Sequence, residues 1–171
     1  MPKISGLGLG EIKKASGLGL GPIKKISGTG LGLLWQDQVI QTIIKNGDRE
    51  VATTDTTVTG WLPDAGSAVL NDGLLVPVNG TYSVVVAGTA TNAYMFGPRW
   101  IQLSFYRNGF EVYDGPEISI PTNTANHPFS MTDPTPRALS TGDYINLRGD
   151  AQSAGNLFIL GGTYLRITSI D

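Results

Sequence analysis

The sequence predicts an all-β domain over residues 35–171, and three observations predict it. Short runs rich in Val, Ile, Thr and aromatic residues alternate with Gly, Pro, Asn and Asp. No segment repeats its apolar residues with a helical period. Many short strands, spread over about 135 residues, suit two packed antiparallel sheets. We therefore expect a jelly-roll sandwich of roughly eight to ten strands.

The apolar runs, taken in chain order, predict strands that end at turn residues. The expected strands cover residues 38–44, 49–59, 67–70, 73–78, 80–89, 99–107, 110–114, 117–120, 143–148, 156–160 and 162–169. Segment 121–137 carries four prolines and is expected to be a long surface loop.

Asparagine and glycine mark the turns between several of these strands. Asn108-Gly109 lies between two aromatic runs and predicts a tight hairpin, because both residues tolerate positive φ. The run from Gly80 to Thr89 has Tyr82, Val84 and Val86 on one face and small or apolar residues on the other. A strand that is apolar on both faces belongs inside a sheet or at an interface.

Four short motifs follow one another along the chain. They are Pro77-Val78-Asn79-Gly80-Thr81-Tyr82, the run Leu103 to Gly109, the run Leu139 to Leu147 and the run Gly161 to Ile167. Their order resembles that of the globular heads of the complement and tumour-necrosis-factor-like superfamily. The resemblance implies a ten-stranded jelly roll that assembles as a homotrimer. Residues expected in the core or the trimer contact are Tyr82, Val84, Val86, Phe105 and Tyr164.

Residues 1–34 form a different segment, which we interpret as an extended anchoring arm. A unit of Ser-Gly-Leu-Gly-Leu-Gly followed by Ile-Lys-Lys recurs every eleven residues, with a fading third copy. The arm holds five lysines and one glutamate, so its net charge is +4. The rest of the chain therefore has a net charge of −6, since the whole chain has −2. Glycine at alternate positions disfavours a helix, and its spacing differs from that of collagen.

A flexible linker would also be rich in glycine, but it needs no apolar residues at fixed places. We expect the arm to bind other virion proteins in extended form, with apolar side chains in pockets and lysines against acidic rims. The expected anchoring residues are Ile4, Leu7, Leu9, Ile12, Lys13, Lys14, Leu18, Leu20, Ile23, Lys24, Lys25, Ile26 and Leu31. The paired lysines alone would give only non-specific attraction to nucleic acid.

The composition excludes most catalytic chemistry. The chain has no cysteine and one histidine, so neither a thiolate metal site nor a multi-histidine centre can form. His127 lies in a polar, turn-rich segment and is expected at the surface rather than in a catalytic triad. No carboxylate pair has a spacing that forces it into one cleft. We therefore expect no enzyme activity, cofactor or metal, and no apolar run is long enough to insert into a membrane.

Two segments outside the expected strands carry apolar side chains that could meet at one tip of the head. The expected tip contacts are Tyr94, Phe96, His127, Phe129 and Met131, with a host-surface glycan or protein as the partner. The alternative is that Phe129 and Met131 cap the core.

These features favour a structural protein of a bacteriophage particle. The chain shows no secretion signal and no collagen-like stalk, which the animal relatives of the resembled superfamily usually carry. We expect a minor tail or tail-tip protein that is made in the host bacterial cytoplasm and located in the virion. A capsid decoration or head-fibre protein, and a free bacterial carbohydrate- or protein-binding module, remain the alternatives.

Overall fold

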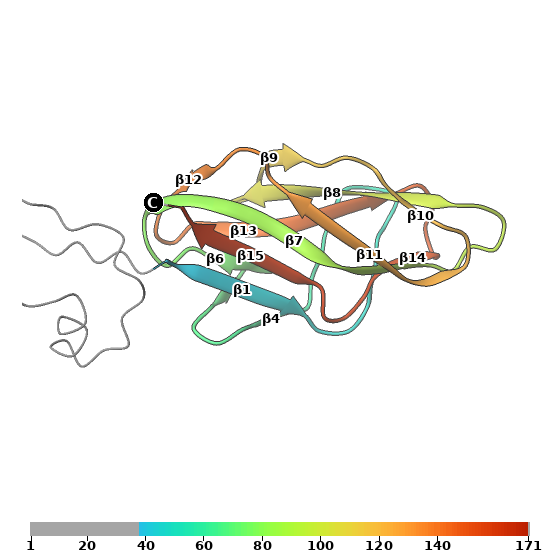
Figure 1. Cartoon of the computed structure of the whole chain (residues 1–171), viewed down its shortest axis with the longest axis horizontal. Helices are drawn as coiled ribbons and strands as arrows, with labels where there is room; N and C mark the ends of the chain where they lie inside the picture. The colour runs from blue at the N-terminus through green and yellow to red at the C-terminus, as the bar shows by residue number, and fades with distance from the viewer. Residues whose placement is uncertain (1–37, 171) are drawn as a thin grey trace, which may run out of the picture. The chain divides into compact units, whose positions relative to one another are not determined.

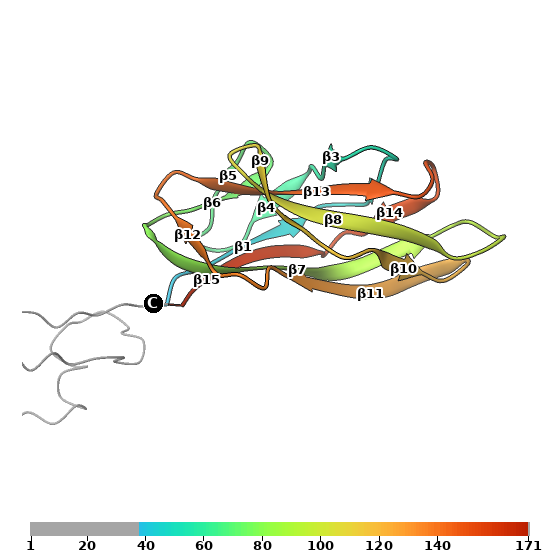
Figure 2. The same cartoon turned by 90° about the horizontal axis from the view of Figure 1, so that it is seen from above.

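The computed structural model describes residues 38–170, which form a β-sandwich and contain no helix. Two antiparallel sheets face each other, as Figures 1 and 2 show, and the expected jelly-roll sandwich is confirmed. Within these residues, no helix could span a membrane. The strands are β1 (Ile40–Lys45), β2 (Arg49–Glu50), β3 (Thr56–Thr57), β4 (Trp61–Pro63), β5 (Val69–Leu70), β6 (Gly73–Leu75), β7 (Gly80–Asn92), β8 (Arg99–Arg107), β9 (Phe110–Asp114), β10 (Ile118–Ile120), β11 (Thr124–Thr132), β12 (Arg137–Leu139), β13 (Tyr144–Ala151), β14 (Leu157–Ile159) and β15 (Tyr164–Ser169).

The first sheet is built around β7, the longest strand. Its order is β2-β14-β7-β15-β1-β4, and β11 and β12 pair with β7 along its other side. The second sheet has the order β10-β8-β13-β6-β5, with β9 beside β8 and β3 beside β13. Figure 2 shows these two layers edge-on.

The core lies between the sheets because alternate residues of each strand point inward. On β7, Tyr82, Val84 and Val86 have no exposed surface, and Phe105 on β8 is equally buried. Tyr164, at the start of β15, is only half-buried. Its neighbours Leu165 and Ile167 fill the core instead.

The segment 121–137 is not the loop that its prolines suggest. It forms β11 and β12, which pair with β7. Because β11 has β7 on one side only, Pro128 can lie in it without leaving a sheet hydrogen bond unmade. A tight turn then leads into β12. In this turn, buried Asp133 accepts hydrogen bonds from the Thr135 N–H and from the guanidinium of Arg137, the first residue of β12.

Other strand boundaries also differ from expectation. The run 49–59 contains only the two-residue strands β2 and β3, and β4 follows where no strand was expected. Trp61 of β4 is buried, and its indole N–H donates to the Val58 carbonyl at 2.6 Å. Strand β13 continues to Ala151, three residues beyond the expected end, because it pairs with β8 over that length.

Two glycines allow close packing between segments. A Cβ on Gly88 of β7 would lie 2.7 Å from the Thr163 Cα, and a Cβ on Gly115 would lie 2.7 Å from the Leu103 carbonyl oxygen. Both positions therefore require the smallest side chain.

Candidate functional site

The predicted anchoring residues, from Ile4 to Leu31, lie outside the described residues. The other predicted residues fall on three parts of the head: a turn network at one end, the outer face of the first sheet, and the opposite end at the β7–β8 connection.

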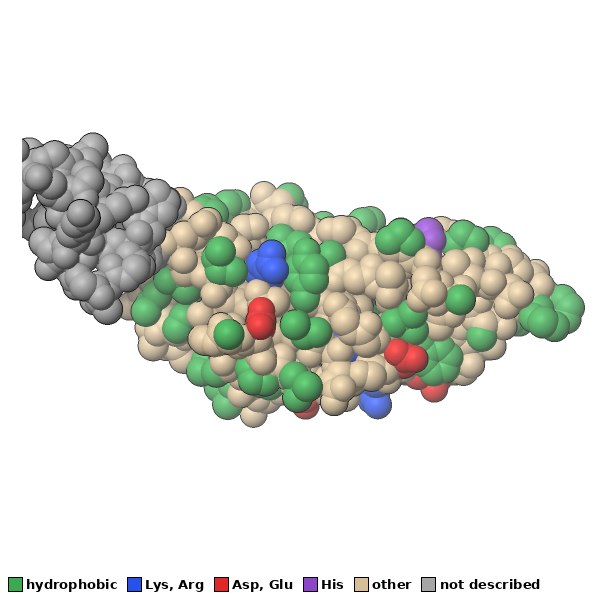
Figure 3. Space-filling view, turned by 60° about the horizontal axis from the view of Figure 1, so that its bottom comes forward, with side chains coloured by type: hydrophobic (Ala, Val, Ile, Leu, Met, Phe, Trp, Pro, Cys, Tyr) green, Lys and Arg blue, Asp and Glu red, His purple; other side chains and the backbone are tan. Residues whose placement is uncertain are grey.

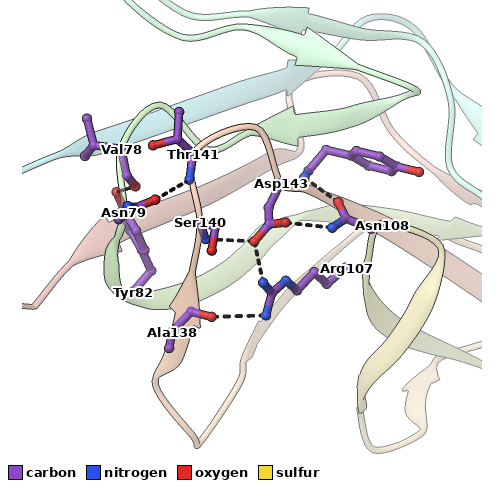
Figure 4. Close-up of polar contacts among 10 residues, drawn as sticks. Val78, Asn79, Tyr82, Arg107, Asn108, Ala138, Ser140, Thr141 and Asp143 are labelled. Atoms are coloured by element: carbon purple, nitrogen blue, oxygen red, sulfur yellow. Dashed lines mark hydrogen bonds and ion pairs between the residues drawn. The ribbon is translucent and has the colours of Figure 1, made fainter.

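The turn network joins the sequence motifs that resemble the superfamily (Figure 4). Asp143 is nearly buried, and its carboxylate accepts from the Ser140 N–H at 2.7 Å and the Asn108 amide at 2.6 Å. The Arg107 guanidinium lies 2.7 Å from the same carboxylate. Burial by itself would raise the pKa of Asp143, but the hydrogen bonds and Arg107 together hold that pKa below its usual value.

The first motif joins the same network through Asn79. Its side-chain oxygen accepts from the Thr141 N–H at 2.8 Å, and the Tyr82 hydroxyl donates to the Val78 carbonyl at 2.8 Å (Figure 4). The motifs therefore hold three strand connections together. They stabilise the architecture and do not form a reactive centre.

The outer face of the first sheet carries an exposed apolar row. Pairing places Leu62 of β4 opposite Ile44 of β1, Ile44 opposite Tyr164 of β15, and Tyr164 opposite Ala87 of β7. Leu62 is 53% exposed and Ile44 is 38% exposed. Ile40, on the same face of β1 four residues before Ile44, is 50% exposed.

We call Ile40, Ile44, Leu62, Tyr164 and Ala87 the first-sheet row. Only Tyr164 was predicted from the sequence. The available signal was in β1, whose run IQTIIK has isoleucine on both faces of the strand. Figure 3 turns the edge formed by β1 and β4 forward and shows hydrophobic side chains on this surface.

Buried Asn92 organises the opposite end of the head. Its amide donates to the Ile120 carbonyl at 3.1 Å, and its side-chain oxygen accepts from the Tyr94 N–H at 2.9 Å. The Asn123 N–H also donates to the Tyr94 carbonyl at 3.1 Å. The β7–β8 connection is thereby tied to the start of β11, as the predicted tip requires.

The predicted tip residues divide between surface and core. Phe96 is 84% exposed, and it meets the half-buried Tyr94 edge-on at 5.7 Å between ring centroids. His127 is half-buried on β11. Phe129 and Met131 are buried, so their prediction as surface contacts is wrong, because strand alternation turns both side chains into the core. Figure 3 shows hydrophobic side chains gathered at this end of the head.

The described residues contain no group of three or more His, Asp or Glu side chains arranged to hold a metal ion. The carboxylate of Asp143 is held by donors on three sides, so it offers no free base to a substrate. The geometry at this end therefore favours a structural role.

The sequence matches no protein-family model and no curated protein. Among solved structures, the chain is similar to the tumour necrosis factor Eiger from S. frugiperda, with a TM-score of 0.54 and 12% identity. That match covers 80% of this chain and 94% of Eiger. Murine APRIL at pH 8.5 matches with a TM-score of 0.51 and 15% identity, over 78% of this chain and all of APRIL. These similarities show a tumour-necrosis-factor-like jelly-roll fold.

Proposed function

We propose that the protein is a non-enzymatic structural protein of a bacteriophage virion, in which three jelly-roll heads associate and residues 1–34 anchor them. The observation that carries this proposal is the first-sheet row. Leu62, Ile44, Tyr164 and Ala87 lie in register on four neighbouring strands, so they form one apolar strip across the sheet. Ile40 lies on the same face of β1, beyond Thr42. Contiguous exposed apolar surface is typical of a protein interface.

Self-association gives this row a partner of the right chemistry. Burying one exposed Leu or Ile side chain stabilises an interface by roughly 1.5–3 kcal/mol at most, and each head offers three such side chains that are already partly exposed. The fold supports the same assembly, because the superfamily heads that the sequence motifs resemble assemble as homotrimers. The row lies on the sheet that contains β1, the first strand after the arm.

The arm supports a place on a particle. Its eleven-residue repeat would present the same apolar and lysine side chains to successive equivalent sites, and its charge of +4 favours acidic protein surfaces. Fully extended, 34 residues reach roughly 110 Å. A minor tail or tail-tip protein that helps to contact the host surface is the first choice. A capsid decoration protein is the second, because a capsid also offers regularly repeated sites.

Sedimentation of the full chain tests the assembly. We expect a trimer, and we expect the double variant Ile44→Arg/Leu62→Arg to sediment as a folded monomer. Phe110→Arg is the matched control, because Phe110 is 78% exposed on the second sheet. A monomeric wild-type protein, or a double variant that remains trimeric, would overturn the proposed assembly.

Immunoelectron microscopy tests the location, with an antibody against residues 35–171. Label at the tail end of phage particles would support a tail protein, and label over the capsid would support the decoration protein. Absence of label from particles would refute the virion location and favour the free binding module.

A further inference from the structure

Two hollows lie next to each other on the outer face of the second sheet, on the other side of the sandwich from the first-sheet row. One has a volume of about 170 Å³ and is lined by residues that include Gln102, Ser104, Tyr106 and Asp150. The other has a volume of about 320 Å³ and is lined by residues that include Trp100, Ser119 and Gln152. We call the two hollows together the second-sheet trough.

Strand pairing makes the trough continuous. Ile101, Leu103 and Phe105 of β8 fill the core, so the residues between them, from Trp100 to Tyr106, face outward. Gln102 lies opposite Asp150 of β13, and the next outward position joins Trp100 to Gln152 through a backbone hydrogen bond of 3.1 Å. At about 3.3 Å per residue, the distance from Trp100 to Tyr106 is roughly 20 Å.

The floor of the trough is held in place by its own hydrogen bonds. The Gln102 amide donates to Asp114 at 3.0 Å and to the Gly115 carbonyl at 2.9 Å, while the Ser104 hydroxyl donates to Asp114 at 2.7 Å. A site whose side chains are already oriented loses little entropy when a ligand binds.

An aromatic side chain lies at each end of the trough. The Tyr106 hydroxyl oxygen lies 2.7 Å from the Asp55 carboxylate and 3.1 Å from the Glu111 carboxylate, and its single O–H donates to one of them at a time. The Arg148 guanidinium lies 4.1 Å from the Tyr106 ring centroid. These contacts fix the tyrosine. At the other end, Trp100 is half-buried and leaves part of its ring at the surface. An indole ring offers a flat apolar surface together with one N–H donor.

The smaller hollow also has a buried polar atom that no residue of the described chain satisfies. It is Asp150 Oδ1, an acceptor. Burial, together with Asp55 and Asp114, raises the pKa of Asp150 above its usual value. Buried polar atoms in native proteins are nearly always hydrogen-bonded, so Asp150 Oδ1 marks a place for a donor from a ligand or water.

The chemistry of the lining selects among ligands. An anion would be repelled by the carboxylates of the trough. A small cation would satisfy Asp150 but would leave the indole of Trp100 without a packing partner. Hydroxyl groups both donate and accept, and sugar rings present a C–H face that packs against an indole. A trough of this length also has room for several linked rings.

We propose that the second-sheet trough binds a neutral oligosaccharide, with one sugar ring packed on Trp100 and hydroxyls bonded to Gln102, Asp150 and Gln152. The inference rests on the proposed function, for which it supplies a class of host-surface ligand. Because the trough and the first-sheet row are on opposite faces, assembly would leave the trough accessible.

Calorimetry and tryptophan fluorescence of the full chain test this proposal. The probes are chitotetraose, maltotetraose, cellotetraose and mannotetraose at millimolar concentration, with tetragalacturonate as the anionic comparison. We expect at least one neutral tetrasaccharide to bind and to change the fluorescence, and Trp100→Ala to weaken that binding by about tenfold or more. Tetragalacturonate should bind less well.

A second variant guards against a folding defect in Trp100→Ala. Ser119→Arg places a long side chain in the trough from the edge strand β10, and it should also weaken binding, whereas Phe110→Arg should leave binding unchanged. Absence of binding by all four neutral sugars would overturn the inference. So would stronger binding of tetragalacturonate, or full affinity in folded Trp100→Ala or Ser119→Arg protein.

The same protein separates the two proposals. A trimer that binds none of the sugars would refute the trough inference alone. A monomer that binds sugar at Trp100 would refute the proposed assembly and leave the sugar site in place.

Discussion

Replacing Asp143 by alanine tests whether the turn network stabilises the head. The substitution leaves the Ser140 N–H, the Asn108 amide and the Arg107 guanidinium without their shared acceptor. The two neutral donors lose about 1 kcal/mol each. The Arg107 side chain is 36% exposed, so solvent screening limits the loss of its ion pair to about 1 kcal/mol or less.

We therefore expect Asp143→Ala to lower the free energy of unfolding by about 2–3 kcal/mol and the melting temperature by several °C, up to about 10 °C. Thermal and urea unfolding, followed by circular dichroism at one fixed protein concentration, would measure both, because self-association makes stability depend on concentration. The control is Asp72→Asn in the exposed turn before β6, which should change little.

The pH dependence gives a second, independent test. The pKa of Asp143 is lower in the folded protein than its ordinary value of 3.8, so the unfolded state takes up the proton first as the pH falls. The stabilisation is therefore present above pH 3.8 and is lost as the pH falls through the folded-state pKa. The difference between wild type and Asp143→Ala should narrow below about pH 4. A difference under about 1 kcal/mol at pH 7, or one that does not narrow in acid, would refute this reasoning.

Two further substitutions test the packing. Gly88→Ala should destabilise the head by about 1–3 kcal/mol in urea unfolding, because the added methyl group meets the backbone at Thr163. The control is Gly47→Ala, where the methyl group has open space and only the positive φ of 67° is unfavourable, so it should cost only about 1 kcal/mol. Phe129→Ser should cost about 3–5 kcal/mol or prevent folding, whereas Phe110→Ser at the exposed hairpin should have little effect; an intact fold with lost attachment would return Phe129 to the surface.

Local sequence signals were enough where a turn and its two strands are adjacent in the chain. The ranges 99–107 and 110–114 were predicted with the bounds that β8 and β9 have. Asn108 and Gly109 between them both adopt positive φ, at 51° and 85°. This conformation depends on those two residues and not on distant contacts, so the sequence was informative.

The same reasoning failed where the neighbouring strand decides the outcome. The prolines of segment 121–137 predicted a loop, but β7 supplies the partner that turns the segment into β11 and β12. Prolines are compatible with an edge strand, and the sequence does not state which strands are at an edge. As a consequence, the sequence left open whether Phe129 and Met131 lie at the surface or cap the core, and their burial shows the core position.

The candidate surfaces depend even more on pairing. The first-sheet row combines residues from β4, β1, β15 and β7. The trough is lined by residues of β8, β9, β10 and β13 and by Asp55, which directly precedes β3. Leu62 and Ile44 are eighteen positions apart in the sequence, and nothing in their local patterns pairs them. Trp100 and Gln152 are still further apart.

The sequence alone determined the all-β class, the hairpin at Asn108-Gly109 and the separation of a basic repeat from an acidic head, because these follow from local backbone preferences and charge. Strand pairing decided which apolar residues are buried, which form the first-sheet row and which polar residues line the trough. The physical reason is that side chains alternate along a strand, so a residue's surroundings depend on the register with strands that are distant in the chain.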